Sequence, residues 1–183
     1  DFFEMRRHYA SGVITGFARL DGFSIGVIGS DPLSKAGAMD GNGADKYAHF
    51  IDLCDTFNLP LVIFLDMPGF MLGSHAERMA TMRRGARALI ASAECQVPKI
   101  EFMVRKSYGV AADAPNSIGL PNGINLRFGW PSGEWGGIPI EGGVAAAYRR
   151  EIAEAEDPDA HRENIENRLL KLRSPFRAAH KGD

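Results

Sequence analysis

An apolar run that ends at Val104 is followed by Arg105-Lys106-Ser107-Tyr108-Gly109-Val110-Ala111-Ala112-Asp113. These residues become small where a strand is expected to turn into a helix. Small side chains at a helix N-terminus leave backbone N–H groups uncovered, and such groups can bind an oxygen that carries negative charge. The segment therefore predicts a strand end with an anion site made of backbone.

A second strand end has the same layout earlier in the chain, in Leu61-Val62-Ile63-Phe64-Leu65-Asp66-Met67-Pro68-Gly69-Phe70. Here an apolar strand breaks into a Pro-Gly loop. Glycine and proline punctuate many strand–helix connections, so each segment taken alone is also explained by structure. Their repetition at successive strand ends favours a site built from backbone rather than from reactive side chains.

Around these two segments the chain alternates strand and helix patterns. Apolar runs and alternation predict strands over 13–20, 23–28, 61–65, 100–104 and 124–128. Helical spacing predicts helices over 44–57, 74–93, 144–155 and 160–172, and a further short helix is expected within 1–10. Asp21-Gly22 is a strong hairpin signal, and Ser74 with Glu77 forms a capping-box pattern. This order predicts an α/β fold, with helices packed around a sheet.

Length and composition set limits on the class of protein. The 183 residues fit a single domain, 1–183, and because the chain opens at Asp1 without Met we expect it to be part of a larger protein. A net charge of −2 gives no reason to expect nucleic acid as a partner. No run reaches the roughly 18–20 apolar residues that span a bilayer. Cys54 and Cys95 form no CxxC pair, which favours a reducing compartment such as the cytoplasm or the mitochondrial matrix.

Other motifs are weaker. Gly22-Phe23-Ser24-Ile25-Gly26 matches the nucleophile elbow of hydrolases, but it starts on a hairpin turn and continues as strand, so we expect Ser24 to be a strand residue. The segment 40–45 lacks the later ligands of a calcium loop, and Asp40 is expected to cap the following helix. His75 lies beside the Pro-Gly loop and is therefore the histidine best placed to belong to an active site. No metal site is expected.

A collinear series of strings resembles the C-terminal half of the carboxyltransferase (beta) subunits of biotin-dependent acyl-CoA carboxylases, of the acetyl-, propionyl- and methylcrotonyl-CoA type. Each string is weak alone, but the series covers nearly the whole chain. It consists of Val13-Ile14-Thr15-Gly16-Phe17-Ala18-Arg19-Leu20-Asp21-Gly22, Ala44-Asp45-Lys46, Leu53-Cys54-Asp55-Thr56-Phe57-Asn58-Leu59-Pro60-Leu61, Asp66-Met67-Pro68-Gly69-Phe70, Val97-Pro98-Lys99, Arg105-Lys106-Ser107-Tyr108-Gly109 and Trp130-Pro131-Ser132-Gly133-Glu134. The resemblance implies a crotonase-like (ClpP/crotonase) fold, in which ββα units wind into a spiral.

The same resemblance implies the chemistry and the partners. Carboxylate would pass from carboxybiotin on a carrier protein to the α-carbon of an acyl-CoA. In the family, an N-terminal half mainly holds the acyl-CoA, and the complete site lies where the N-half of one subunit meets the C-half of another. The expected partners are therefore a carboxyltransferase N-terminal half, the biotin carboxyl carrier and biotin carboxylase components, and further copies in a homo-oligomer. Alone, the chain is expected to be inactive.

Site residues are carried over by position. The backbone N–H groups of Val110 and Ala111 are expected to be the oxyanion donors, although many family members have glycine at Val110. A bulky residue at Ala111 is expected to block the pocket without unfolding the domain. The biotin side is expected to comprise Pro68, Gly69, Phe70, Tyr108 and Gly109, and the acyl side Ala112 and Asp113. Ala114 and Pro115 depart from the usual pattern, so the acyl group stays open.

Three alternatives remain open. A decarboxylase subunit would run the same chemistry in reverse, from an acyl thioester to biotin. A non-catalytic half could act as a scaffold that only completes a dimer, since Val110 replaces glycine and the N-half is missing. A serine hydrolase built on Ser24 is the most remote of the three.

Overall fold

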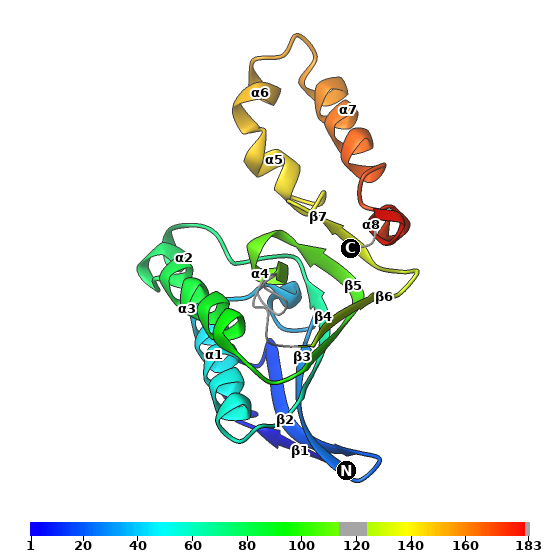
Figure 1. Ribbon diagram of the computed structural model, residues 1–183. Helices are drawn as coiled ribbons and strands as arrows, with labels where there is room; N and C mark the ends of the chain where they lie inside the picture. The colour runs from blue at the N-terminus through cyan, green and yellow to red at the C-terminus, as the bar shows by residue number, and fades with distance from the viewer. Residues whose placement is uncertain (114–123, 182–183) are drawn as a thin grey trace.

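One seven-stranded mixed sheet organises the molecule. The computed structural model describes residues 1–113 and 124–181. The strands follow the order β1-β2-β3-β4-β5-β6, and β7 pairs with the far end of β5 (Figure 1). Strands β1 to β3 are antiparallel, whereas β3 to β7 pair in parallel. The strands are β1 (Phe2–Met5), β2 (Val13–Leu20), β3 (Phe23–Ser30), β4 (Leu61–Met67), β5 (Lys99–Tyr108), β6 (Asn125–Gly129) and β7 (Glu134–Gly136).

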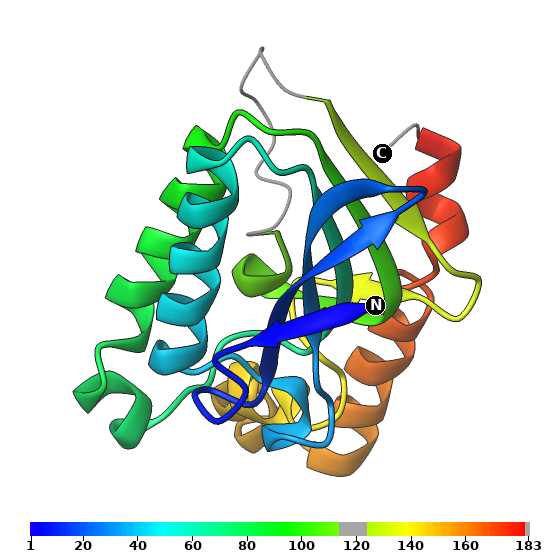
Figure 2. The same ribbon diagram turned by 90° about the horizontal axis from the view of Figure 1, so that it is seen from below.

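Helices cover one face of this sheet. The helices are η1 (Lys35–Gly37), α1 (Gly41–Thr56), α2 (Ser74–Arg78), α3 (Thr81–Glu94), α4 (Gly109–Asp113), α5 (Gly143–Ala147), α6 (Arg149–Ala153), α7 (Pro158–Leu170) and α8 (Pro175–Lys181). Helices α1 and α3 lie side by side along the sheet (Figure 2). Helices α5 to α7 extend away from it as a helical arm, which packs around its own small cluster of Ile140, Val144 and Ile165 (Figure 1).

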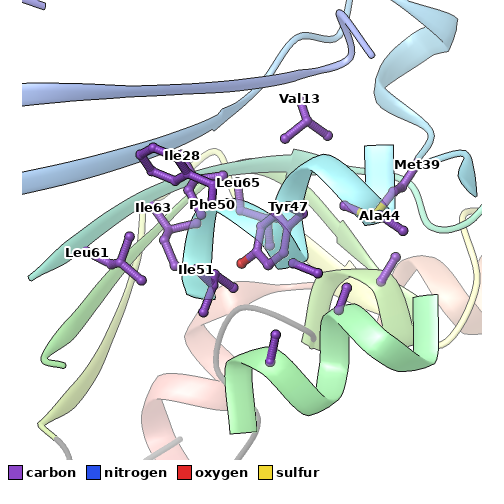
Figure 3. Close-up of a cluster of buried hydrophobic side chains, with 14 of the residues drawn as sticks. Val13, Ile28, Met39, Ala44, Tyr47, Phe50, Ile51, Leu61, Ile63 and Leu65 are labelled. Atoms are coloured by element: carbon purple, nitrogen blue, oxygen red, sulfur yellow. The ribbon is translucent and has the colours of Figure 1, made fainter. Parts of the chain in front are cut away.

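The main core lies between β4 and α1 (Figure 3). Leu61, Ile63 and Leu65 are buried because alternate residues of a strand face the same side. Phe50 and Ile51 of α1 are buried against them. Burial of each such aliphatic side chain contributes about 1.5–3 kcal/mol, so this layer holds the strand ends in place.

The predicted hairpin and the predicted helix cap at Asp40 are confirmed. Leu20 pairs with Phe23, and Asp21 and Gly22 both have positive φ, at 49° and 86°, as a type I′ turn requires. Asp40 caps α1, because its Oδ1 accepts the Gly43 N–H at 2.7 Å. Helix α1 consequently starts at Gly41, three residues before the predicted start at 44.

Three predictions for the first half of the chain are wrong. Residues 2–5 form strand β1 instead of a helix, since Phe2 and its neighbours pair with the exposed edge of β2. The capping box at Ser74 does not form: Gly73 is the N-cap of α2, and no side chain caps it. The helix predicted over 74–93 is split into α2 and α3, because Ala80 adopts a left-handed conformation with φ 53°.

The second half differs in its helix boundaries. The helix predicted over 144–155 is two short helices, α5 and α6, which meet at Tyr148. Helix α7 is confirmed, but it begins at Pro158 and ends at Leu170, whereas 160–172 was predicted; Asp157 caps it by accepting the Ala160 N–H at 3.0 Å. Helix α8 and strand β7 were not predicted. Within the described residues, no helix is long and apolar enough to cross a membrane.

Candidate functional site

Strand β5 changes partner along its length, and this change creates the site. Its first half pairs with β6 and its last residues pair with β7. Between these halves its register with β4 shifts, since Leu65 pairs with Met103 but Met67 pairs with Ser107. The extra residues of β5 form a bulge. Because a bulge bends its strand, it redirects the backbone on the C-terminal side of the irregularity.

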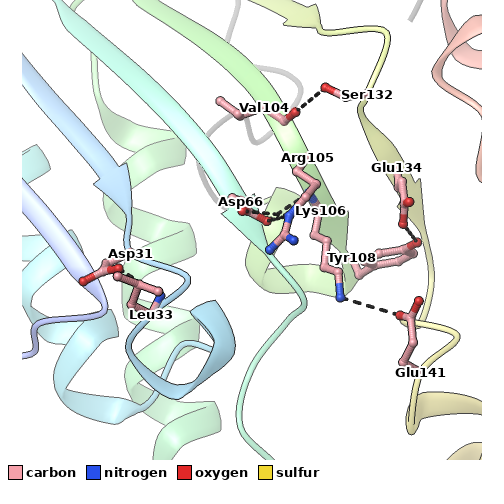
Figure 4. Close-up of polar contacts among 10 residues, drawn as sticks. All are labelled: Asp31, Leu33, Asp66, Val104, Arg105, Lys106, Tyr108, Ser132, Glu134 and Glu141. Carbon is pink, nitrogen blue, oxygen red and sulfur yellow. Dashed lines mark hydrogen bonds and ion pairs between the residues drawn. The ribbon is translucent and has the colours of Figure 1, made fainter.

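The Asp66 carboxylate of β4 holds the bulge in place (Figure 4). It accepts the backbone N–H of Lys106 at 3.1 Å and the Nε–H of Arg105 at 3.1 Å. On the other side, the Ser132 hydroxyl donates to the Val104 carbonyl at 3.0 Å. The loop at 130–132 therefore supplies a hydrogen bond to β5 that a neighbouring strand would have supplied in a regular sheet.

The two predicted strand ends lie next to each other. A Cβ on Gly69 would lie 3.4 Å from the carbonyl oxygen of Tyr108, and Gly69 has φ 125°. A Cβ on Gly109, at φ 65°, would lie 3.4 Å from the carbonyl oxygen of Gly137. The loops after β4, β5 and β7 thus converge at the end of the sheet, with glycine where their backbones approach.

Helix α4 starts at Gly109, directly after β5, as the sequence predicts. Val110 and Ala111 are in its first turn, where N–H groups have no acceptor within the helix. Val110 is 52% exposed, whereas Ala111 and Ala112 are fully buried in the main core. Asp113 is the last helical residue, and its side chain lies outside the described part of the structure, as do residues Ala114 and Pro115.

The Pro68–Phe70 loop is anchored by Met39. The Met39 N–H donates to the Gly69 carbonyl at 3.0 Å, and the Met71 N–H donates to the Met39 carbonyl at 2.9 Å. The ring of Phe70 packs so closely on Gly85 of α3 that a Cβ there would collide with it. Phe70 therefore supports the loop from the helical layer.

Sequence reasoning missed a polar clamp at the end of β5 (Figure 4). The buried Tyr108 donates its hydroxyl to Glu134 Oε2 at 3.1 Å, and Arg173 donates to the same oxygen at 3.2 Å. Burial, and then the neighbouring Glu134 carboxylate, raise the pKa of Tyr108 to about 12. The signal for this clamp was Glu134 itself, which the sequence analysis used only as the end of one string of the resemblance.

Lys106 forms a second polar contact at this end of the sheet. Its ammonium lies 3.6 Å from the Glu141 carboxylate, on the segment that follows β7 (Figure 4). A hydrogen bond from its own backbone N–H and the charge of Lys106 lower the pKa of Glu141, so this carboxylate stays ionised. The clamp and this ion pair together fix β5 to β7.

The candidate nucleophile and histidine lie elsewhere. Ser24 is exposed within β3 and pairs with Arg19 of β2, so the strand interpretation is confirmed. His75 is exposed on α2 and lines a hollow of about 190 Å³ together with Met79. In residues 1–113 and 124–181, no group of three or more His, Cys, Asp or Glu side chains could hold a metal ion.

A mixed sheet with convergent glycine loops at its parallel strand ends defines a crotonase-like α/β protein, the class expected from the sequence. The chain belongs to the carboxyl transferase domain family, whose model matches residues 1–182. The resemblance to the carboxyltransferase subunits of biotin-dependent acyl-CoA carboxylases is thereby confirmed.

Individual relatives agree with this family. The chain is 37% identical to the propionyl-CoA carboxylase carboxyltransferase subunit of Haloferax mediterranei, over 99% of its own length and 35% of that protein. It is also 37% identical to the methylmalonyl-CoA decarboxylase subunit alpha of Propionigenium modestum, over 100% and 35%. The chain therefore spans about a third of the length of these relatives.

A solved structure shares the fold. The crystal structure of transcarboxylase 12S superposes on the whole chain with a TM-score of 0.85, at 36% identity, and the match covers 35% of that protein. That structure is a hexamer assembly of a multienzyme core, with methylmalonyl-CoA and methylmalonic acid bound.

Proposed function

We propose that the chain is the part of a carboxyltransferase that receives carboxybiotin, and that the enzyme moves the carboxyl group to the α-carbon of an acyl-CoA. One observation carries this proposal: the loops after β4 and β5 meet beside the first turn of α4. The N–H groups of Val110 and Ala111 are the proposed oxyanion donors. Both donors are backbone groups, so the N–H at position 110 is kept although Val110 stands where many family members have glycine.

The residues present suit a planar ring that carries an oxyanion. Glycine at 69 and 109 leaves the backbone uncovered, and both positions have positive φ. Bound carboxybiotin would supply the carboxyl group and the base that takes the α-proton. The chain itself would hold the negative oxygen through fixed N–H dipoles, which act without reorganisation during the reaction.

The described side chains divide the proposed roles further. Phe70 packs on α3 and Tyr108 binds Glu134, so both support the loops from behind. Pro68, Gly69 and Gly109 form the proposed wall on the biotin side. On the acyl side, Ala112 is buried in the core, so it would support the acyl site from behind. Asp113 is the proposed residue that meets the acyl group.

Decarboxylation is a second candidate for the direction of transfer. The observation in its favour is the identity of 37% to the methylmalonyl-CoA decarboxylase subunit alpha of Propionigenium modestum. The same backbone donors would stabilise the same anions in either direction. The partners proposed for both directions are a carboxyltransferase N-terminal half and a biotin carrier, in a homo-oligomer; biotin carboxylase would be a further partner for carboxylation.

The test is a chimera in which this chain replaces the matching segment of the transcarboxylase 12S subunit. Labelled carboxyl transfer is followed between a carboxylated biotin carrier and a panel of acyl-CoAs, and then in reverse. Transfer in either direction supports the carboxyltransferase function, and the acyl-CoA that reacts fastest identifies the acyl group. A folded, assembled chimera that transfers nothing would contradict both directions and favour a scaffold half.

A further inference from the structure

Most of the face of the sheet opposite α1 and α3 has no helix packed on it among the described residues (Figures 1 and 2). Helix α8 adjoins this face only at its β6 edge, where Pro175 and Phe176 line a hollow together with Phe128. Because strand residues alternate, this open face carries the neighbours of the buried core residues. The pairing register aligns its side chains in two rows across β4, β5 and β6. The first row is Val62, Ile100 and Leu126, and the second is Phe64, Phe102 and Phe128.

The second row is a ladder of stacked aromatic rings. Phe64 lies 5.5 Å from Phe102, and Phe102 lies 5.5 Å from Phe128, with interplanar angles of 17° and 22°. Phe64 is 42% exposed, Phe128 is 47% exposed, and Leu126 in the first row is 46% exposed. These six residues contain no charged group. Parallel sheets are normally covered on both faces, and a contiguous apolar patch of this kind marks an interface.

The open face also borders the site. By the same alternation, Asp66 and Val104 follow Phe64 and Phe102 on this side of the sheet. Both lie at the bulge that directs β5 to Gly109. A partner seated on the aromatic ladder would therefore reach the strand ends that carry the proposed site.

We propose that the open face is the seat of the carboxyltransferase N-terminal half. The chain spans about 35% of its relatives, so most of their polypeptide is available to cover this patch. Two contiguous apolar rows suit a permanent apolar partner, as in obligate interfaces. The identity of the partner rests on the proposed function, whereas the burial of the face does not.

Cysteine reporters test this proposal, because native Cys54 and Cys95 are both buried. Phe128→Cys and, separately, Phe64→Cys are introduced into the chain alone and into the 12S chimera. Ile90→Cys, on the exposed side of α3, is the matched control. The rate of maleimide labelling is measured in each. We expect both reporters to label roughly tenfold slower or more in the chimera, while Ile90→Cys labels at one rate in both.

Two results would overturn the proposal. Equal reactivity of both reporters in the chain and the assembled chimera would show that the face stays exposed to solvent after assembly. Slow labelling in the chain alone, together with a doubled mass in sedimentation, would assign the face to a second copy. Labelling needs no turnover, so a protected reporter in a chimera without transfer activity would refute the proposed function and keep the interface.

Discussion

The Asp66 carboxylate accepts the backbone N–H of Lys106 at 3.1 Å, across the bulge of β5. The same carboxylate binds Arg105, and its side chain is mostly buried. A strand irregularity is thus held by a side chain of the neighbouring strand. This contact determines where β5 ends and therefore where the first turn of α4 begins.

Removal of this carboxylate is expected to destabilise the protein. In Asp66→Ala the Lys106 N–H loses its acceptor in a half-buried position, at a cost of about 1–3 kcal/mol. Urea unfolding measures the difference. The matched control is Asp52→Ala, which removes an exposed ion pair with Arg87 and is expected to cost less than about 1 kcal/mol. Equal stability of the two variants would show that the bulge needs no such acceptor.

Glycine at the strand ends is expected to be required by conformation. Gly69→Ala places a side chain at φ 125°, next to the Tyr108 carbonyl, and such strain costs about 1–3 kcal/mol. Gly137→Ala is the control, because a Cβ there meets nothing within 4 Å and its φ is not positive. We expect the first variant to unfold at lower denaturant concentration and the second to match the parent. A Gly69→Ala protein as stable as the parent would contradict a strained backbone conformation at this position.

Tyr108 is expected to make stability fall at alkaline pH. Its pKa is about 12 in the folded chain against 10.0 for a free phenol, so only the unfolded chain ionises between these values. The stabilisation is therefore present below pH 10 and is lost as the pH rises toward 12. In Tyr108→Phe this part of the loss should disappear from unfolding curves measured across the range. Tyr9→Phe, at an exposed position, should leave the profile of the parent unchanged.

Position 110 is the proper place to block the proposed pocket. Ala111 is a poor place for the bulky residue that the sequence analysis suggested, because it is fully buried and overpacking of a core costs about 1–3 kcal/mol. Val110→Trp instead adds bulk at an exposed position of the same turn. We expect it to abolish carboxyl transfer in the chimera while thermal unfolding stays unchanged, and Val110→Gly to retain transfer. Full activity of Val110→Trp would refute the assignment of the site to this turn.

Local signals predicted the parts of the fold that local chemistry decides. Asp21-Gly22 set a turn, Asp40 set a helix start, and the apolar runs before Pro68 and Gly109 set two strand ends. Strand β1 escaped prediction because its short segment becomes a strand only by pairing with β2.

The site was predicted as two strand ends, but its supports were not. The bulge in β5 arises from pairing with two different strands, which the sequence of β5 alone does not encode. The clamp joins Tyr108 to Glu134 and Arg173, residues far apart in the chain. The burial of Ala111 likewise depends on helices that pack from outside its own segment.

The shared oxygen of Glu134 has a mechanical consequence. Tyr108 ends β5 and Arg173 follows the last turn of α7, and both bind the same carboxylate. The Trp135 N–H also donates to the Arg173 carbonyl at 3.1 Å. The base of the helical arm and the start of α4 are therefore linked through the Glu134 carboxylate. A displacement of the arm would be transmitted to Gly109, so the position of the arm and the geometry of the turn are set together.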